Sequence, residues 1–182
     1  MIGINHRSQS ERIRILDESS DSAPVAGTVD ISVPCDIFWE HFRQAHRWSK
    51  WNACFFWVAN RELVQGRQLI WAFQPIKRCY LYRMPAWARI VELVPGQRVT
   101  WEVTAVPGMY ARHTYSAEDL GFGRTRFGSW EKAMGPGFRL MERFWTAHFM
   151  FVNHESLTGA QRLETIYKNH GSLGDPAWYR EA

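Results

Sequence analysis

Cysteine is scarce in the 182-residue sequence: it occurs only at Cys35, Cys54 and Cys79, and no two of these form a CxxC pair. Three widely spaced cysteines give no zinc signature and fit a reducing compartment. The N-terminus has no apolar core of signal-peptide length, and no apolar run approaches the ~20 residues that cross a bilayer. We therefore expect a cytoplasmic protein without an integral membrane segment.

Short motifs of several enzyme classes are also missing. There is no Gly-rich phosphate-binding loop, since Gly121 and Gly123 are typical of a hairpin turn, and there is no GxSxG nucleophile elbow. His41 and His46 would lie about 140° apart around a helix, unlike the two histidines of HExxH. Lysine and arginine are scattered among acidic residues despite a net charge of +4, which argues against a nucleic-acid surface. We expect no metal, no cofactor and no nucleic-acid partner.

Aromatic residues, by contrast, are abundant: the chain contains 10 Trp, 11 Phe and 6 Tyr. Large flat side chains in such numbers suit either an aromatic core or the lining of an apolar pocket. The length fits one domain with a sizeable core. Composition alone therefore leaves two alternatives, a structural role and a ligand-binding role, for most of these rings.

The longest periodic segment lies between Gly135 and Gly171. Its apolar residues recur at steps of three and four, which predicts one helix over residues 138–169, about 45 Å long. Pro136 suits the first helical turn, and Gly171 suits a left-handed cap at the end. A helix of this length needs a broad surface to pack against.

The chain upstream of this helix supplies such a surface. Its patterns predict a strand over residues 25–33, two short helices, and then about six antiparallel strands separated by Pro and Gly turns. Strands followed by a helix indicate an α+β fold. The polar, Ser-rich residues 1–23 are expected to form a flexible arm, residues 24–171 the domain, and residues 172–182 a C-terminal tail.

This ordered set of elements resembles the START-like or SRPBCC superfamily, also called the helix-grip fold, over roughly residues 24–170. The resemblance rests on ISVPCDIFWEHF, the tryptophan pair in WSKWNA, the glycine before LIWAF, VELVPGQRVTW, GRTRF, the Gly-Pro before the helix, and ESLTGAQRLE. The chain looks most like bacterial polyketide cyclase/dehydrase-type members.

The resemblance implies a curved antiparallel sheet of six to seven strands wrapped around the C-terminal helix, with a deep apolar cavity between them. Members bind lipids, sterols, hormones and polyketides, and some catalyse cyclisation or dehydration, so the fold does not settle the function.

Strand alternation predicts which side chains face this helix. His113 and Tyr115 lie on the more apolar face of one strand, and Glu131 faces inward if the face with Arg126 and Lys132 meets water. His113 and Glu131 lie at equal distances from the hairpin turn, which brings them near one another. A one-residue bulge would reverse any of these orientations.

His113, Glu131 and Tyr115 are the candidate catalytic residues, because burial tunes a carboxylic acid and an imidazole toward proton transfer near neutral pH, while the tyrosine would orient a substrate. The candidate ligand-binding residues are Trp57, Trp71, Trp101, Phe127, Ser129, Trp145, His148, Phe149 and Ser156. The alternative interpretation makes the histidines hydrogen-bonded core residues, pairs the glutamate with an arginine and assigns the rings to core packing.

Three functional hypotheses follow. The first is a carrier or sensor that binds a hydrophobic or aromatic small molecule, lipid- or polyketide-like, in the cavity. The second is a cyclase, aromatase or dehydratase that uses an acid/base pair beside the ligand. The third is an assembly protein, which an exposed apolar patch outside the cavity would favour. A homodimer is compatible with each of them.

Overall fold

The computed structural model describes residues 25–77, 81–104 and 107–180. The predicted N-terminal arm and Cys79 lie outside these ranges. The elements are, in order, β1 (Val25–Ile31), α2 (Cys35–Phe42), η1 (Ala45–Arg47), α3 (Trp48–Trp51), β2 (Phe55–Val58), β3 (Gln68–Phe73), β4 (Met84–Val94), β5 (Arg98–Val103), β6 (Tyr110–Gly121), β7 (Arg124–Met134), α4 (Pro136–Leu140), α5 (Glu142–His170) and η2 (Pro176–Arg180).

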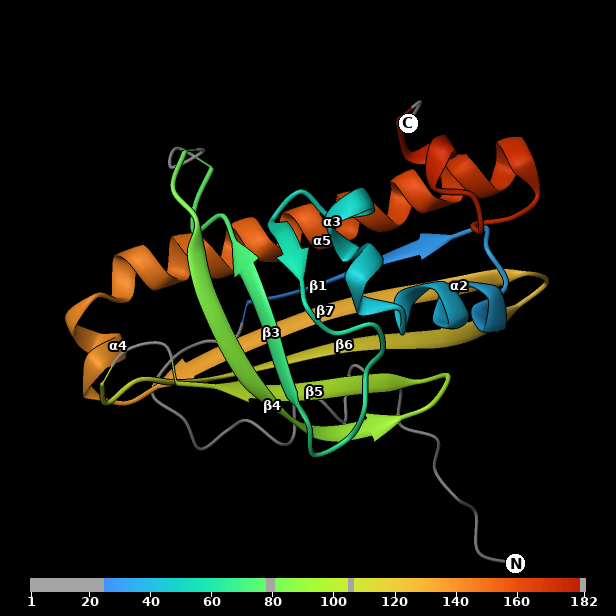
Figure 1. Ribbon diagram of the computed structural model, residues 1–182. Helices are drawn as coiled ribbons and strands as arrows, with labels where there is room; N and C mark the ends of the chain where they lie inside the picture. The colour runs from blue at the N-terminus through green and yellow to red at the C-terminus, as the bar shows by residue number, and fades with distance from the viewer. Residues whose placement is uncertain (1–24, 78–80, 105–106, 181–182) are drawn as a thin grey trace, which may run out of the picture.

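The strands form one antiparallel seven-stranded sheet in the order β1-β7-β6-β5-β4-β3-β2. The sheet curls, and α5 packs along its β1 and β7 side (Figure 1). The predicted α+β architecture, with a curved sheet wrapped around a long C-terminal helix, is therefore confirmed. In the described ranges, no helix combines the length and the apolarity needed to cross a membrane.

The predicted long helix is present but is interrupted near its start. Met141, with φ −126° and ψ 29°, separates the five-residue α4 from the 29-residue α5. The backbone N–H of Gly137 donates to the carbonyl oxygen of Gly108 at 3.1 Å, which ties α4 to the turn before β6. A side chain on Gly135, whose φ is 100°, would collide with that same carbonyl group. At the far end, Gly171 forms the predicted left-handed cap with φ 66°.

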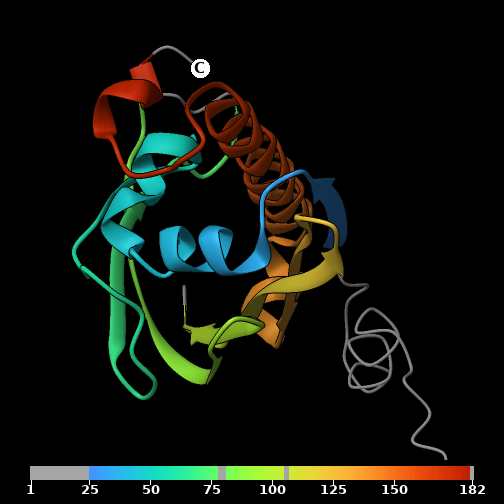
Figure 2. The ribbon, with the colours of Figure 1, turned by 90° about the vertical axis from the view of Figure 1, so that its right-hand side faces the viewer.

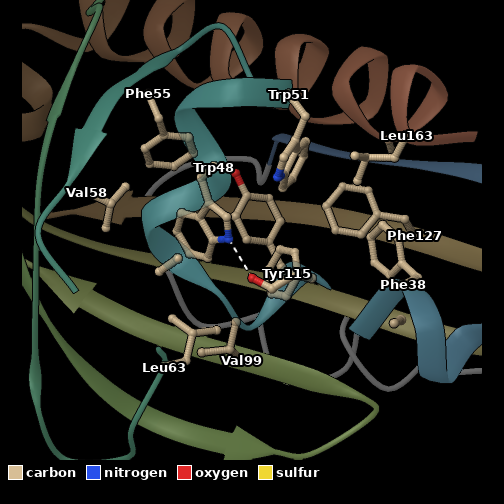
Figure 3. Close-up of a cluster of buried hydrophobic side chains, with 14 of the residues drawn as sticks. Phe38, Trp48, Trp51, Phe55, Val58, Leu63, Val99, Tyr115, Phe127 and Leu163 are labelled. Carbon is tan, nitrogen blue, oxygen red and sulfur yellow. Dashed lines mark hydrogen bonds between the residues drawn. The ribbon is translucent and has the colours of Figure 1, made fainter. Parts of the chain in front are cut away.

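The short helices α2 and α3 fill one part of the concave side of the sheet (Figure 2). Phe42 from α2 and Trp48 from α3 are 0% exposed, and their rings lie 5.2 Å apart. Trp48 Nε1 donates a hydrogen bond to the Phe42 carbonyl oxygen at 2.7 Å. Phe42 packs against Tyr115 and Phe127 of the sheet, and Trp48 packs against Tyr115. Figure 3 shows Trp48 beside Tyr115 in this cluster. This part of the interior is therefore a solid aromatic core.

The outer face of β7 is only partly as predicted. Arg126 is half-exposed and its Nε donates to Asp30 Oδ1 on β1 at 2.7 Å. Lys132, expected to meet water on the same face, is 2% exposed. A lysine is almost never fully buried unless it is partnered, and Lys132 does have an interaction partner. The predicted exposure of Lys132 was therefore wrong.

The residues after Gly171, expected to form a tail, fold back onto the domain. Leu173 is buried, and Trp178 stacks on His170 with ring centroids 4.4 Å apart. The hydroxyl group of Tyr179 donates to the carbonyl oxygen of Leu173 at 2.9 Å and lies 3.0 Å from His41 Nε2. His41 on α2 is thereby enclosed.

This enclosure predicts a pH-dependent stability. Burial, with a smaller contribution from Arg47, lowers the pKa of His41 from 6.5 to about 4. Between these two values the unfolded chain binds more protons, so the free energy of unfolding falls as the pH is lowered from about 7 to 4. The contribution of His41 is at most about 3 kcal/mol at 1.36 kcal/mol per pKa unit. Chemical denaturation at both pH values should show a smaller loss for His41→Gln than for the wild type. Equal losses would contradict the prediction.

Candidate functional site

A cavity lies between the sheet and the first half of α5. Its volume is about 50 Å³. Strands β2 to β7 contribute one wall and α5 the other, with most side chains apolar or aromatic. The lining residues are Cys54, Phe55, Trp71, Phe73, Ala86, Trp101, Val103, Met109, Ala111, His113, Glu131, Trp145, His148, Phe149 and Val152.

The cavity is smaller than the deep cavity that the resemblance implies. Sites for drug-sized ligands usually measure roughly 300–1,000 Å³. The rings of α2 and α3 occupy the space beside Tyr115 and Phe127 (Figure 3), which leaves the cavity only the region next to Trp145 and Phe149. The cavity lies between sheet and helix as predicted, but its volume is smaller than the resemblance implies.

His113 and Glu131 meet in the cavity wall. They are direct cross-strand partners on β6 and β7, and His113 Nδ1 lies 3.1 Å from Glu131 Oε2. The two residues are 3% and 7% exposed. Their predicted proximity is confirmed, and the partner of the glutamate is this histidine rather than an arginine. The even spacing about the β6–β7 turn was sufficient to predict the contact.

The ring of His113 is held on several sides. Trp101 stacks on it with centroids 4.8 Å apart, and the ring of Tyr115 lies 4.4 Å away. His113 Nε2 lies 3.3 Å from Ser129 Oγ. Because both ring nitrogens have protein neighbours and Trp101 stacks on the ring, the imidazole is oriented by the sheet. Ser129 thus acts on the site through His113, since it does not itself line the cavity.

His148 faces the same cavity from α5. Its Nδ1 lies 2.5 Å from the carbonyl oxygen of Pro75, and since a carbonyl oxygen can only accept, Nδ1 carries the proton. Burial lowers the pKa of His148, and the nearby Glu131 partly opposes this shift. A neutral imidazole protonated at Nδ1 leaves the lone pair on Nε2. His148 therefore has the protonation pattern of a proton acceptor.

Trp145 lies one helical turn before His148. Its ring meets that of His148 edge to face, with centroids 5.8 Å apart, and lies 6.5 Å from that of Phe149. Trp145 is 2% exposed, yet its Nε1 has no hydrogen-bond partner within the described residues. Glu131 Oε2 also has no hydrogen-bond partner there, because its contact with His113 Nδ1 lacks hydrogen-bond alignment. Trp145 Nε1 thus has no partner among the described residues, whereas Glu131 Oε2 lacks a hydrogen bond but lies 3.1 Å from His113 Nδ1.

Tyr115 and Ser156 were predicted to face a ligand, but they do not line the cavity. The Tyr115 hydroxyl oxygen lies 2.6 Å from Ser156 Oγ, which also accepts from Asn52 Nδ2 at 3.0 Å. Burial raises the pKa of Tyr115 well above its usual value, so the phenol stays protonated. These groups form a satisfied buried network that joins β6, α5 and the segment after α3. Phe127 is likewise a core residue outside the cavity wall.

Trp57 is also outside the cavity, with 46% of its surface exposed. The register of β2 against β3 shifts between Phe55 and Trp57, so both Phe56 and Trp57 point outward. This is the one-residue bulge that reverses an alternation. Of the predicted site residues, the structure brings seven together around the cavity: Trp71, Trp101, His113, Glu131, Trp145, His148 and Phe149.

Several lining residues were missed although alternation could have found them. Phe73 lies two residues after Trp71 on β3, and Ala111 lies two before His113 on β6, so each shares an inward face with a predicted residue. Met109 continues the same series. Cys54 and Phe55, by contrast, follow an irregular connection and carried no such signal.

Outside the cavity, apolar side chains are exposed on the outer side of β2 to β4. Ile70 and Trp87 are direct cross-strand partners and are 40% and 60% exposed, close to the outward-pointing Phe56 and Trp57 in the neighbouring strand. An exposed apolar surface of this kind favours the assembly-protein hypothesis. Across the described ranges, no group of three or more His, Cys, Asp or Glu side chains is arranged to hold a metal ion.

No protein-family model and no curated protein sequence matches the chain. Solved structures do resemble it. The ZhuI aromatase/cyclase from Streptomyces sp. R1128 aligns with a TM-score of 0.66 and 14% identity, over 82% of this chain and 97% of that one. A START superfamily protein from Mycobacterium smegmatis aligns with a TM-score of 0.57 and 10% identity, over 78% and 99%. Truncated norcoclaurine synthase from Thalictrum flavum gives 0.53 and 12%, over 80% and 97%.

These similarities, together with the curled sheet and the long C-terminal helix, define the class: the chain has the START-like, or SRPBCC, helix-grip fold. At such low identities the neighbours establish the fold alone. In this fold, the cavity lies between α5 and the curled sheet.

Proposed function

We propose that the protein binds a small hydrophobic or aromatic molecule in the cavity between the sheet and α5. The observation that carries this proposal is the composition of the wall, where aromatic rings surround the buried His113–Glu131 pair. Apolar walls with a few convergent polar groups are typical of small-molecule sites. The cytoplasmic location and the homodimer stay predictions.

The cavity volume sets a condition on this function. An engineered cavity of about 150 Å³ holds benzene, and the cavity here measures about 50 Å³. An aromatic ligand must therefore displace side chains as it enters. Met109, unbranched and part of the wall, is suited to such a change, because methionine adapts its rotamers at little cost.

Filling the cavity tests the proposal. Ala86 lines the cavity and is only half-buried, so Ala86→Leu adds volume to the wall without a large effect on folding. We expect the variant to bind toluene at least about tenfold more weakly than the wild type, because the ligand and the added side chain compete for one space. NMR titration of the amide resonances of Ala111 and Val152 measures the affinity. Ala177→Leu, at an exposed alanine, is the matched control. Unchanged binding in Ala86→Leu would refute the site.

A second function, general acid–base catalysis, is favoured by a specific observation. Glu131 and His113 form a buried pair, and the neutral imidazole of His148 lies in the same cavity. Cyclisation and dehydration of keto compounds both begin with removal of a proton from the carbon beside a carbonyl group. The C–H bond breaks, the proton passes to Glu131 or His148 Nε2, and the electron pair moves to the carbonyl oxygen as an enolate.

Exchange of the α-protons of cyclohexanone in D2O separates the two functions. If the protein is an enzyme of this kind, Glu131→Gln should slow the protein-dependent exchange by about 100-fold or more, with toluene binding retained. Glu62→Gln, at an exposed glutamate, is the control. Loss of binding without any exchange activity in the wild type would support the carrier instead.

A further inference from the structure

A row of polar and charged side chains crosses the outer face of the sheet. Arg89 of β4 lies directly across from Glu102 of β5, and Glu102 lies directly across from Arg112 of β6. Gln68 of β3 is the partner of Arg89 on the other side. All four residues are exposed. The row therefore contains two cationic side chains and one anionic side chain on neighbouring strands.

The single carboxylate of this row is bound by only one of the two arginines. Arg112 Nε donates to Glu102 Oε1 at 3.0 Å, and Arg112 Nη2 donates to the same oxygen. The side chain of Arg89 forms no hydrogen bond and no ion pair with any residue that the structure describes. A guanidinium group carries five N–H donors in a fork that matches a carboxylate. Arg89 is therefore open to a carboxylate from another molecule.

An apolar row lies beside the charged row. Trp87 precedes Arg89 by two residues on β4, and Ile70 of β3 is the direct cross-strand partner of Trp87. Two residues along a strand span about 7 Å. Phe56 and Trp57 point outward from β2, the next strand, and extend the apolar surface. The outer face thus presents a cationic group and exposed aromatic rings at a fixed separation.

The two rows border a hollow of about 410 Å³, lined by Gln68, Trp87, Arg89 and Glu102 among others. A recess accepts a side chain of a partner, whereas a bilayer surface meets groups that protrude. The apolar surface beside the hollow crosses three strands, about 10 Å in width, which is more than one small molecule covers. Tryptophan and arginine are the residue types most enriched where protein interfaces gain their affinity. These observations favour a polypeptide as the occupant.

We propose that the outer face of β2 to β4 is a docking surface for a polypeptide segment that presents a carboxylate beside a bulky apolar side chain. The carboxylate of the segment binds Arg89 and completes the alternation of charges across the strands. Its apolar side chain packs on Trp87 and Ile70. This surface is separate from the cavity, because none of these three residues lines the cavity.

Random dodecapeptides displayed on phage and selected on the wild type test the proposal. We expect enriched peptides to carry Asp or Glu within two residues of a bulky apolar residue. They should bind Trp87→Ala and Arg89→Gln at least about tenfold more weakly, because each change removes a central contact. Phe122→Ala and Arg124→Gln, at exposed residues in and beside the β6–β7 turn, are the matched controls and should bind like the wild type.

An exchange of charges identifies the contact with Arg89. When the acidic residue of the tightest peptide is replaced by lysine, binding to the wild type should be lost. Arg89→Glu should bind this lysine peptide more tightly than the original peptide, a result that misfolding cannot produce. Added NaCl should weaken the binding of the original peptide more in the wild type than in Arg89→Gln, because an exposed ion pair is screened by salt.

Equal binding of the selected peptides by the wild type, Trp87→Ala and Arg89→Gln would refute the inference, as would the enrichment of no peptide. Sedimentation velocity and vesicle binding examine two other occupants. A dimer that Trp87→Ala dissociates would place a second copy of the chain on this face. Binding to vesicles of phosphatidylserine and phosphatidylcholine in equal parts, lost in Arg89→Gln, would place a lipid surface there. Either result overturns the proposal, and unchanged toluene binding in both variants leaves the proposed function of the cavity unaffected.

Discussion

Trp48→Ala is expected to destabilise the protein by about 3–5 kcal/mol, the usual cost of removing a large aromatic side chain from a core. Trp48 is 0% exposed, and its ring lies 5.1 Å from that of Phe55 and 5.7 Å from that of Trp101. The substitution leaves a cavity among rings from α2, β2, β5 and β6, and it also leaves the Phe42 carbonyl oxygen without its indole donor.

Thermal unfolding followed by circular dichroism measures this effect. For a protein of this length, a loss of 1 kcal/mol lowers the melting temperature by roughly 2–4 °C, so the expected fall is about 10 °C. Trp87→Ala, at a tryptophan that is 60% exposed on the outer face of β4, is the matched control and should change stability by less than about 1 kcal/mol. Similar losses in both variants would contradict the assignment of Trp48 to the core.

Gly159→Ala is the second substitution with a large expected effect. We expect it to lower the stability of the protein, although helix propensity alone would predict an increase. In an unpacked helix, alanine is more stable than glycine by about 1 kcal/mol. At Gly159 in α5, however, an added Cβ would lie 2.6 Å from the carbonyl oxygen of Trp51 and 2.7 Å from its ring. The backbone of α3 has to move, and we expect a net loss of about 1–3 kcal/mol.

The displacement should also reach the cavity. α3 leads directly into Cys54 and Phe55, which line it, so Gly159→Ala is expected to weaken toluene binding as well. Gly174→Ala is the control, because its added Cβ would meet Ser172 Oγ at 3.4 Å, an ordinary contact. A raised melting temperature for Gly159→Ala would show that the two helices are not in close contact.

Local patterns in the sequence were sufficient to predict the elements that carry the site and its central pair of residues. The three- and four-residue steps predicted α5, and alternation about the β6–β7 turn placed His113 beside Glu131. Strand alternation, extended by two residues along β3 and β6, would also have predicted Phe73 and Ala111 as residues of the cavity wall. These predictions succeed because a helix or a hairpin determines the relative positions of its own residues through backbone geometry alone.

Predictions that depended on more distant parts of the chain were less successful. A bulge in β2 turned Trp57 outward, and Asn52 joined Ser156 and Tyr115 in a network that removes both from the cavity. Lys132 is buried, although its face of β7 was expected to be exposed to solvent. In each case the orientation or the partner was decided by a contact that no local period describes.

The sequence by itself determined the elements of this protein, their order, the helix-grip architecture and the cross-strand pair at its candidate site. Only the tertiary structure decided how much space remains inside. The cavity measures about 50 Å³ because rings from α2 and α3 pack into the concave side of the sheet next to Tyr115 and Phe127. Cavity volume is what remains after side chains from segments far apart in the chain have packed together, and periodicity within one segment carries no information about that remainder.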